Sequence, residues 1–369
     1  MANLVLYRKY RPKTFSEIVG QEHVVRTLTN AISTGMVSHA YLFAGPRGTG
    51  KTTIARLLAK AVNCKNRKEG EAEPCNQCDS CSEINQGNAI DLIEIDAASN
   101  RGIDEIRDLR DGIRFVPTKA KYKVFIIDEA HQLTREAANA LLKTLEEPPS
   151  HAIFVLATTE AHKMIPTIVS RCQRFDFRRL SAPEITGRLK TILEKEKVKF
   201  EEDALNLIAL SANGSIRDAE SLLDEVVSFS GVNGEVKKEI VEQLLGIADR
   251  ETIFKFLNYV SQKKPKEAVE FLNELYFKGI DLKEFTKSLI QYLREILLLK
   301  IAQESQNPLF LGLDDEEKKE LQSLAEGFSE EELKKILEIF MDAEQKMKYA
   351  SISQLPLELA IVEICHPNQ

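Results

Sequence analysis

The sequence predicts an α/β fold in which a parallel sheet is covered by helices on both faces, followed by two helical domains. Three observations support this fold class. Residues 45–52 read GPRGTGKT, a glycine-rich loop between an apolar run and an amphipathic one. Short apolar runs then alternate with helix-like stretches up to about residue 178, the pattern of parallel strands joined by crossover helices. Beyond that point only helical periodicity remains.

Length and composition indicate a globular chain of several domains. Its 369 residues are too many for one compact core, so two or three domains are expected. No apolar run approaches the roughly 18 residues that span a bilayer, and residues 1–12 carry Arg8, Lys9 and Arg11 rather than an apolar signal core. We therefore expect a cytoplasmic protein with no membrane partner and with reduced thiols.

Charge is distributed unevenly along the chain. Residues 1–180 carry 26 Lys and Arg against 21 Asp and Glu, whereas residues 181–369 carry 24 against 36. The first half is suited to face a polyanion, and the second resembles a solvated acidic scaffold. A drift of charge without functional meaning is an equally good interpretation of these totals.

The elements of the first domain follow one another in a regular order. A helix is expected over 21–34, a strand over 39–44 and a second helix over 52–62. Further strands are expected over 89–95, 124–127 and 153–157, with helices over 103–113 and 135–145. A strand, a glycine loop and a helix in succession form the context that a phosphate-binding loop requires.

The glycine loop predicts a nucleotide site. Glycines allow backbone N–H groups to turn inward around phosphate oxygens, and the helix that follows adds its positive end. Lys51 is expected on the β- and γ-phosphates of the nucleotide, and Thr52 is expected to ligate Mg²⁺. The whole loop is predicted to bind nucleotide, namely Gly45, Pro46, Arg47, Gly48, Thr49, Gly50, Lys51 and Thr52.

Two adjacent carboxylates, Asp128 and Glu129, end the apolar run 124–127. The carboxyl ends of parallel strands form the ligand-binding edge of such sheets. Asp128 is the expected second Mg²⁺ ligand, and Glu129 is expected to polarise the attacking water. His131 completes a DEAH string, which we interpret as incidental because no other helicase-type motif is present.

Four cysteines, Cys64, Cys75, Cys78 and Cys81, have the spacing C-x10-C-x2-C-x2-C and predict a metal module over 64–81. Four thiolates suit tetrahedral zinc with no open position, so one structural Zn²⁺ is expected. An iron–sulfur cluster is the alternative.

A small helical domain is expected over 179–242, after a first domain over 1–178. Ser181 and Glu184 form a capping box, Asn213-Gly214 reads as a helix stop, and Ser215 restarts the chain as a helix. A third, all-helical domain is expected over 243–369. It carries two apolar stripes, for which we favour partner packing over an intramolecular core: Phe285, Leu289, Ile290, Leu293, Ile296 and Leu297; Leu333, Ile336, Leu337 and Phe340.

Two arginines are open to more than one interpretation. Arg171 follows the fourth expected strand and is placed to reach the γ-phosphate of a neighbouring subunit. Arg217 lies in the first turn of an expected helix, where it is placed to respond to bound nucleotide. By position alone, either is better explained as an ordinary surface cation.

Taken together, these residues resemble the AAA+ clamp-loader family, and within it the bacterial gamma/tau type. The resemblance is carried by the loop, the cysteine module and a series of further strings: YRKYRP at 7–12, IVGQ at 18–21, HAYLF at 39–43, DLIEIDAAS at 91–99, NALLKTLEEPP at 139–149, LATT at 156–159, SRC at 170–172 and GSIRDA at 214–219. It covers about the first 245 residues strongly and the remainder more loosely.

The resemblance implies an AAA+ ATPase domain, a lid and a collar that assembles a five-membered ring with delta, delta-prime and further gamma/tau subunits. It implies that ATP binding opens a sliding clamp and grips primer–template DNA, within a nucleoid-associated replicative polymerase complex whose polymerase chemistry lies elsewhere. By the same resemblance Arg171 becomes a trans-acting finger, Arg217 a second sensor, and Thr158 or Thr159 the first sensor. Arg8, Arg11 and Val19 are then expected near the adenine.

Two other functions remain open: a ring scaffold that binds nucleotide without hydrolysing it, and another AAA+ DNA motor such as a branch-migration ATPase. Contacts with DNA are expected on backbone phosphates, with residues 100–103 as the candidate and an ordinary surface helix as the alternative. Since tau-type chains continue beyond the collar, an end at Gln369 suggests either a short gamma-like form or a piece of a longer product.

Overall fold

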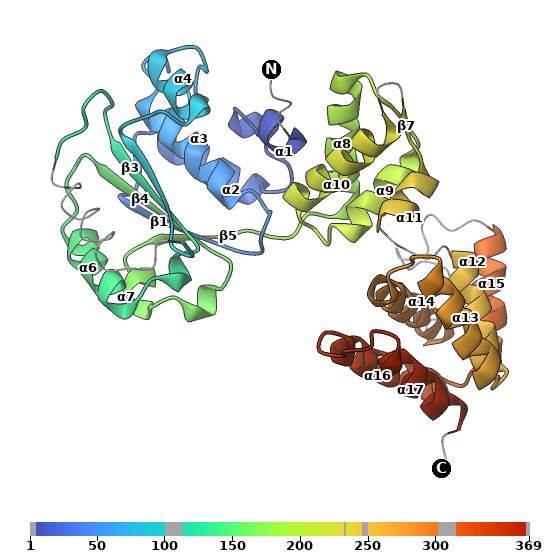
Figure 1. The fold of residues 1–369 in the computed structure, drawn as a ribbon. Helices are drawn as coiled ribbons and strands as arrows, with labels where there is room; N and C mark the ends of the chain where they lie inside the picture. Colours follow the sequence, from blue (N-terminus) through green and yellow to red (C-terminus); the bar gives the residue numbers. More distant parts are fainter. Residues whose placement is uncertain are drawn as a thin grey trace. The chain divides into compact units, whose positions relative to one another are not determined.

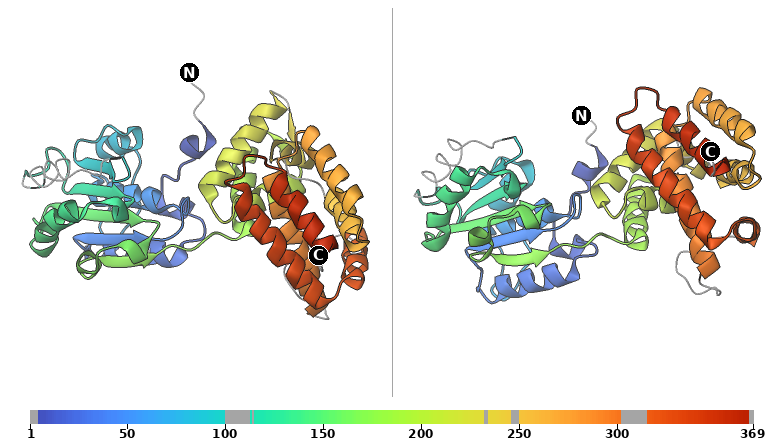
Figure 2. Two further views of the ribbon diagram at one scale, coloured as in Figure 1. Left: turned by 60° about the horizontal axis from the view of Figure 1, so that its bottom comes forward. Right: turned by 90° about the horizontal axis from the view of Figure 1, so that it is seen from below.

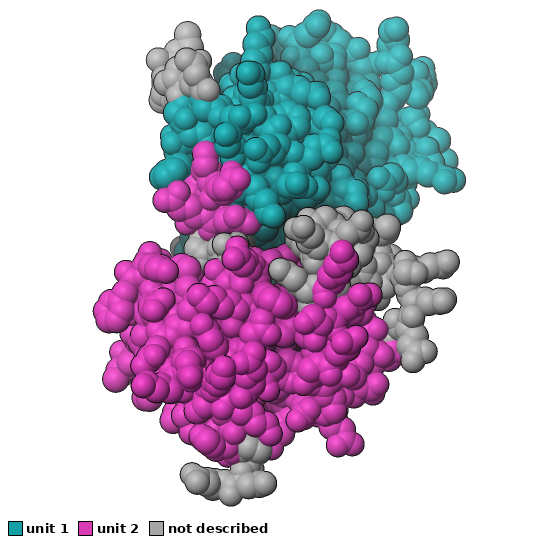
Figure 3. All heavy atoms as spheres, turned by 90° about the vertical axis from the view of Figure 1, so that its right-hand side faces the viewer, with its two compact units in different colours: residues 1–238 teal, residues 239–369 magenta. Residues whose placement is uncertain are grey.

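The computed structural model describes residues 5–99, 113, 115–231, 234–245, 250–301 and 315–366. The chain divides into two compact units, residues 1–238 and 239–369, which Figure 3 colours separately. The candidate DNA contact at 100–103 and nearly all of the helix expected over 103–113 lie outside the described residues.

Unit 1 is built on a five-stranded parallel sheet in the order β2-β3-β4-β1-β5 (Figure 1). The strands are β1 (Ala40–Ala44), β2 (Leu92–Asp96), β3 (Lys123–Asp128), β4 (Ala152–Thr158) and β5 (Gln173–Asp176). Four of these confirm expected strands to within a few residues. The fifth, β5, was not predicted: it is a short edge strand with only Phe175 buried, so it lacks the apolar run of the others.

Helices cover both faces of the sheet, as predicted (Figure 1). Along β1, Tyr41 and Phe43 pack on one face with α2 (Glu22–Ser33) and α3 (Lys51–Asn63). Ala40 and Leu42 pack on the other with α6 (Arg135–Glu146) and α7 (Pro166–Val169). Because successive side chains of a strand point to opposite faces, a strand buried on both reads as a continuous apolar run.

Short elements complete the sheet domain. They are α1 (Leu6–Lys9), α4 (Asp79–Gln86) and three single-turn 3₁₀ helices at Phe15–Glu17, Ala130–Gln132 and Ala161–Lys163. Helix α4 begins inside the cysteine module, directly after Cys78.

The rest of unit 1 contains α8 (Ala182–Glu196), α9 (Glu202–Ser211) and α10 (Ile216–Ser230). The capping box at the start of α8 is confirmed, and Ser215 caps α10 by accepting a hydrogen bond from the Asp218 N–H. Two short parallel strands, β6 (Lys199–Phe200) and β7 (Glu235–Val236), also pair here, so the expectation of a purely helical region is wrong in this detail. The expected boundary at residues 178 and 179 stays a prediction.

Unit 2 is helical in its described part (Figure 2). Helix α11 (Lys238–Leu245) begins at the unit boundary and is followed by α12 (Arg250–Ser261), α13 (Pro265–Phe277), α14 (Leu282–Ile301), α15 (Asp315–Gly327), α16 (Glu330–Met347) and α17 (Leu355–Cys365).

The two apolar stripes lie on α14 and α16 and pack into the core of unit 2 itself, so the preference for partner packing is wrong for them. The exposed apolar side chains of this unit are different ones, including Phe277, Tyr349 and Leu359. Among the described helices, none combines the length and the apolar character needed to cross a bilayer.

Candidate nucleotide site and cysteine cluster

The phosphate loop joins β1 to α3, and three of its glycines have positive φ: Gly45 at 149°, Gly48 at 74° and Gly50 at 96°. Space is as restrictive as conformation. A Cβ atom at Gly45 would lie 2.4 Å from the Phe177 carbonyl oxygen, and one at Gly48 would lie 1.9 Å from the Ser215 Oγ at the start of α10. The loop is therefore pressed between β5 and α10 at points where only glycine fits.

Lys51 opens α3 and is 6% exposed. Its Nζ donates hydrogen bonds to the carbonyl oxygens of Gly45 and Pro46, both at 2.7 Å. Burial lowers the pKa of Lys51, and the nearby carboxylates of Glu129 and Asp128 act in the opposite direction. The ammonium group is thus held against the loop by neutral acceptors, next to the two carboxylates.

The two carboxylates expected at the end of β3 are held in different ways. Asp128 accepts hydrogen bonds from the Thr52 hydroxyl at 2.7 Å and from the Glu129 N–H at 3.0 Å. Glu129 has a left-handed backbone with φ 47°, and its Oε2 accepts from the hydroxyl and the N–H of Thr159, at 2.8 and 3.2 Å. The predicted Mg²⁺ ligands thus touch each other, and Glu129 touches one candidate first sensor.

The side chain of His131, which we interpreted from sequence as incidental, is 4% exposed and lies within this group. Its Nδ1 lies 3.0 Å from the Thr158 hydroxyl and 3.4 Å from Glu129 Oε2, and its Nε2 lies 3.0 Å from Glu160 Oε2. The histidine therefore joins Thr158 to Glu129, which Thr159 contacts directly. The DEAH spelling was the only signal for it in the sequence, and we discounted it.

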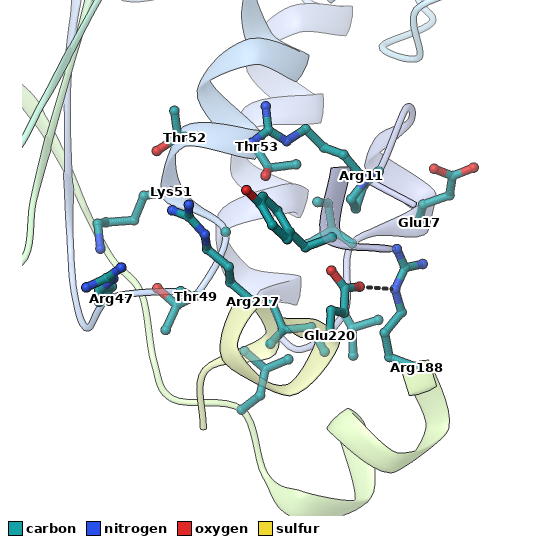
Figure 4. A pocket seen from close by; sticks show the side chains of 18 of the residues that line it. Arg11, Glu17, Arg47, Thr49, Lys51, Thr52, Thr53, Arg188, Arg217 and Glu220 are labelled. Carbon is teal, nitrogen blue, oxygen red and sulfur yellow. Dashed lines mark hydrogen bonds and ion pairs between the residues drawn. The ribbon is translucent and has the colours of Figure 1, made fainter. Parts of the chain in front are cut away.

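A cavity extends from the phosphate loop between the sheet domain and the first turns of α10 (Figure 4). Its lining includes most of the loop and the predicted residues Arg11, Val19 and Arg217. Arg217 lies over the Tyr7 ring, with Cζ 5.0 Å from the ring centroid. Arg8 also lies against Tyr7, at 5.8 Å, but is not among the lining residues, so its expected place beside the adenine has no support from the cavity.

A buried ion pair in the cavity wall was not predicted. Arg188 on α8 and Glu220 on α10 are 3.1 Å apart, and Arg188 also donates to the Tyr10 carbonyl oxygen (Figure 4). Burial raises the pKa of Glu220, and Arg188 opposes this. Each residue sits on an ordinary amphipathic helix, so only the tertiary structure reveals the pair.

Arg171 lies away from this cavity. It directly precedes Cys172 and β5, whose strand runs parallel to β1, so it belongs to the end of the sheet opposite the phosphate loop. Its guanidinium donates to the Thr167 carbonyl at 2.8 Å and pairs with Glu146 at 2.6 Å.

The four cysteines of the expected metal module come together, with sulfur atoms all within 4.8 Å of one another. Backbone N–H groups point at two of the sulfurs: Cys75 donates to Cys64, and Gln77 and Cys78 donate to Cys75. Hydrogen bonding by the Gln77 N–H is the main cause that lowers the pKa of Cys75 to about 6, whereas burial raises that of Cys64. This donor set is compatible with a bound metal ion.

Known families match three successive parts of the chain. Residues 20–181 match the family described as DNA polymerase III, delta subunit, and residues 184–232 match the ATPase lid domain of the DNA polymerase III clamp loader subunit. Residues 236–369 match domain III of DNA polymerase III subunits gamma and tau.

Individual relatives agree with these matches. DNA polymerase III subunit tau of Bacillus subtilis is 45% identical over 100% of this chain, which spans 64% of that relative's length. The gamma subunit of Buchnera aphidicola (Acyrthosiphon pisum) is 38% identical, with 98% of each sequence covered. Among solved structures, the RuvB branch migration motor of Thermotoga maritima aligns with 85% of this chain and 98% of its own, at 20% identity and a TM-score of 0.49, too remote to bear on function. The chain therefore belongs to the DNA polymerase III gamma and tau subunit family of AAA+ clamp-loader proteins.

Proposed function

We propose that this chain is an ATP-hydrolysing motor subunit of a bacterial clamp loader, which uses ATP binding to open a sliding clamp and load it on primed DNA. The observation that carries the proposal is a hydrogen-bonded group beside Lys51, at the cavity that extends from the phosphate loop. The group consists of Thr52, Asp128, Glu129 and Thr159. Family membership supplies the setting, because the relatives are named as DNA polymerase III subunits.

The residues divide the chemistry between them. Lys51 and the N–H groups of the loop would neutralise the β- and γ-phosphates. Glu129 would orient a water molecule on the γ-phosphorus and accept its proton, while the bond from the γ-phosphorus to the β-bridging oxygen breaks and ADP leaves with the electron pair. Thr159 holds Glu129 in place, and Arg217 would contact the nucleotide from α10.

Two metals fit residues of this chain. The Thr52 hydroxyl and the Asp128 carboxylate are oxygen donors in direct contact, which suits Mg²⁺; the ion would neutralise phosphate charge. The cysteine sulfurs form a closed set, which suits one structural Zn²⁺ rather than a catalytic one.

Arg171 would act on a neighbouring subunit. Its position at the opposite end of the sheet from the phosphate loop argues against a role in its own site. A finger of this kind needs assembly, so the partners we propose are further gamma/tau copies with delta- and delta-prime-type subunits in a five-membered ring. The ring would hold primer–template DNA through its phosphates.

ATP turnover measured with and without clamp and primed DNA tests the proposal. We expect stimulation by both together, and loss of about 100-fold or more in Glu129→Gln with ATP binding retained. Arg171→Ala should lower turnover of the assembled ring but leave nucleotide affinity of the isolated chain unchanged.

Other outcomes would favour the alternatives. Nucleotide binding without turnover in the assembled ring would indicate a scaffold subunit. Directional strand displacement without clamp loading would indicate a branch-migration type of motor. Purified chain that is folded but holds no zinc by elemental analysis would contradict the structural metal.

A further inference from the structure

Hydrogen bonds connect the cysteine module to the segment that forms one wall of the nucleotide cavity. Residues 11–19, here called the wall segment, contribute Arg11, Pro12, Glu17, Ile18 and Val19 to the cavity lining. Figure 4 shows Arg11 and Glu17 on the side away from Lys51. Because the phosphate loop holds the other side, this wall faces the nucleoside part of a bound nucleotide.

Glu73 makes the first contact. It lies two residues before Cys75, and its two carboxylate oxygens accept hydrogen bonds from the Phe15 and Ser16 N–H groups, both at 2.8 Å. The Phe15 ring is 1% exposed and packs into the core beneath α2 and α3. A carboxylate from the module thus satisfies the backbone of the wall segment at its centre.

Lys60 and Asn76 make the second contact. The Lys60 side chain, from the last turns of α3, is 2% exposed. Its Nζ donates to the Lys13 carbonyl at 2.9 Å and to Asn85 Oδ1 at 2.8 Å, as well as to Asn76 Oδ1. Asn76 follows Cys75 and donates to the same Lys13 carbonyl at 3.1 Å.

Two of these three residues, Glu73 and Asn76, have positions that depend on the cysteines. Glu73 and Asn76 flank Cys75, and Asn76 has φ 57°, a left-handed turn within the run of cysteines. Side chains on a loop of this kind keep their positions only while the loop is closed. Opening the module would therefore release Phe15 and Ser16, and it would leave the Lys13 carbonyl with Lys60 as its donor.

We infer that Glu73 and Asn76 are positioning residues for the nucleoside part of the nucleotide, so that the folded cysteine module sets affinity for the nucleoside but not for the triphosphate. This inference rests on the nucleotide site proposed above. It gives the module a role inside its own chain, apart from any partner.

The test compares two ligands on the full chain in the presence of Mg²⁺: ATP and inorganic tripolyphosphate. In Glu73→Gln the amide can accept from only one of the two N–H groups and turns its own NH₂ toward the other. ATP must then order the loosened wall segment when it binds, at a cost of about one hydrogen bond to a charged group, so ATP affinity should fall about tenfold. Tripolyphosphate affinity should stay within about twofold, since the loop is untouched.

Asn76→Gly is the second variant, because glycine keeps the left-handed backbone while removing the side-chain hydrogen bonds of Asn76, including those with Lys60 and Lys13. Glu71→Gln is the matched control: Glu71 lies on the same loop and loses the same charge, but its carboxylate lies near Lys68, at 3.8 Å. We expect the two test variants to lose ATP affinity selectively and the control to match the wild type.

Stripping the metal from the wild-type chain and then restoring Mg²⁺ should reproduce the selective loss, with faster amide exchange at Phe15 and Ser16. Equal losses of ATP and tripolyphosphate affinity, or unchanged ATP affinity in both test variants, would overturn the inference alone. A wild-type chain that binds neither ligand would overturn the nucleotide site as well.

Discussion

The two ends of helix α3 are held in different ways, although both are buried and polar. Its N-terminus begins at left-handed Gly50, with no side-chain cap and with the phosphate loop around it. Its C-terminus is fixed by side chains: Asn63 exchanges two hydrogen bonds with the Tyr122 backbone, at 2.8 and 2.9 Å, and Lys60 has three acceptors.

The two ends of α3 therefore have different roles. Its N-terminus, here called the binding end, is arranged to hold a ligand, and its C-terminus, here called the building end, is arranged to hold the fold together. Where α3 begins, uncapped N–H groups and the helix dipole suit an anionic ligand, so substitutions there should affect ligand affinity and turnover before folding. Where α3 ends, every buried polar partner comes from the chain itself. Removing one leaves its neighbours unsatisfied, so substitutions there should affect folding first.

Lys51→Ala gives the largest effect and acts at the binding end. ATP turnover should fall by about 100-fold or more, since the variant lacks the positive charge that would neutralise the transferring phosphoryl group. The unfolding midpoint should change little, because removal of a buried, desolvated ammonium group offsets the loss of its hydrogen bonds to the Gly45 and Pro46 carbonyls. A variant that fails to fold would break the distinction between the two ends.

Lys60→Met acts at the building end. The substitution keeps the length of the side chain but leaves the Asn85 amide oxygen without its Lys60 donor, and it leaves the Lys13 carbonyl with Asn76 alone. The free energy of unfolding should fall by about 2–3 kcal/mol, measured by urea denaturation of the full chain. Lys65→Met, at a lysine whose side chain is 52% exposed, is the control and should be nearly neutral.

Gly48→Ala tests how closely the loop and α10 are fitted. The new Cβ would lie 1.9 Å from Ser215 Oγ, and the alanine backbone would have to keep a φ of 74°. ATP affinity should fall about tenfold, equivalent to 1.4 kcal/mol. Combining it with Ser215→Gly removes the atoms that clash and should restore part of the affinity; no restoration would mean that backbone strain alone is responsible.

Glu184→Gln has the smallest effect and depends on pH. The Arg178 guanidinium donates hydrogen bonds to the two carboxylate oxygens of Glu184 at 2.6 and 2.9 Å. These bonds, with those from Ser181, lower the pKa of Glu184 from 4.5 to about 2. Since the folded pKa is lowered, the stabilisation is present above pH 4.5 and is lost as pH falls toward 2. The variant should be about 1 kcal/mol less stable at pH 7, and the difference should shrink below pH 4.5 in thermal unfolding.

Much of unit 1 could be predicted from sequence because its elements have strong local signals. The run that became β1 is apolar throughout since both of its faces are covered, and the glycines of the loop have conformations that few other residues adopt. The cysteine spacing likewise predicted a cluster, and the four sulfur atoms do lie together.

The features that were missed depend on contacts between distant residues. Strand β5 has polar residues at three of its four positions and is a strand because β1 lies beside it. The Arg188–Glu220 pair joins two helices whose surfaces look ordinary in sequence. The stripes on α14 and α16 were recognised, but periodicity cannot tell whether the surface that covers them belongs to the same chain.

The position of β1 within the sheet has a consequence for synthesis of the chain. β1 pairs on one side with β4, which begins at Ala152, and on the other with β5, which ends at Asp176. The strand that leads into the phosphate loop is therefore made early but has no neighbour until much later residues have left the ribosome. Pairing over such separations is slow, so the emerging chain must keep this apolar run from aggregating while it waits. Chains that end just before and just after β5, once released from the ribosome, should differ sharply in protease resistance.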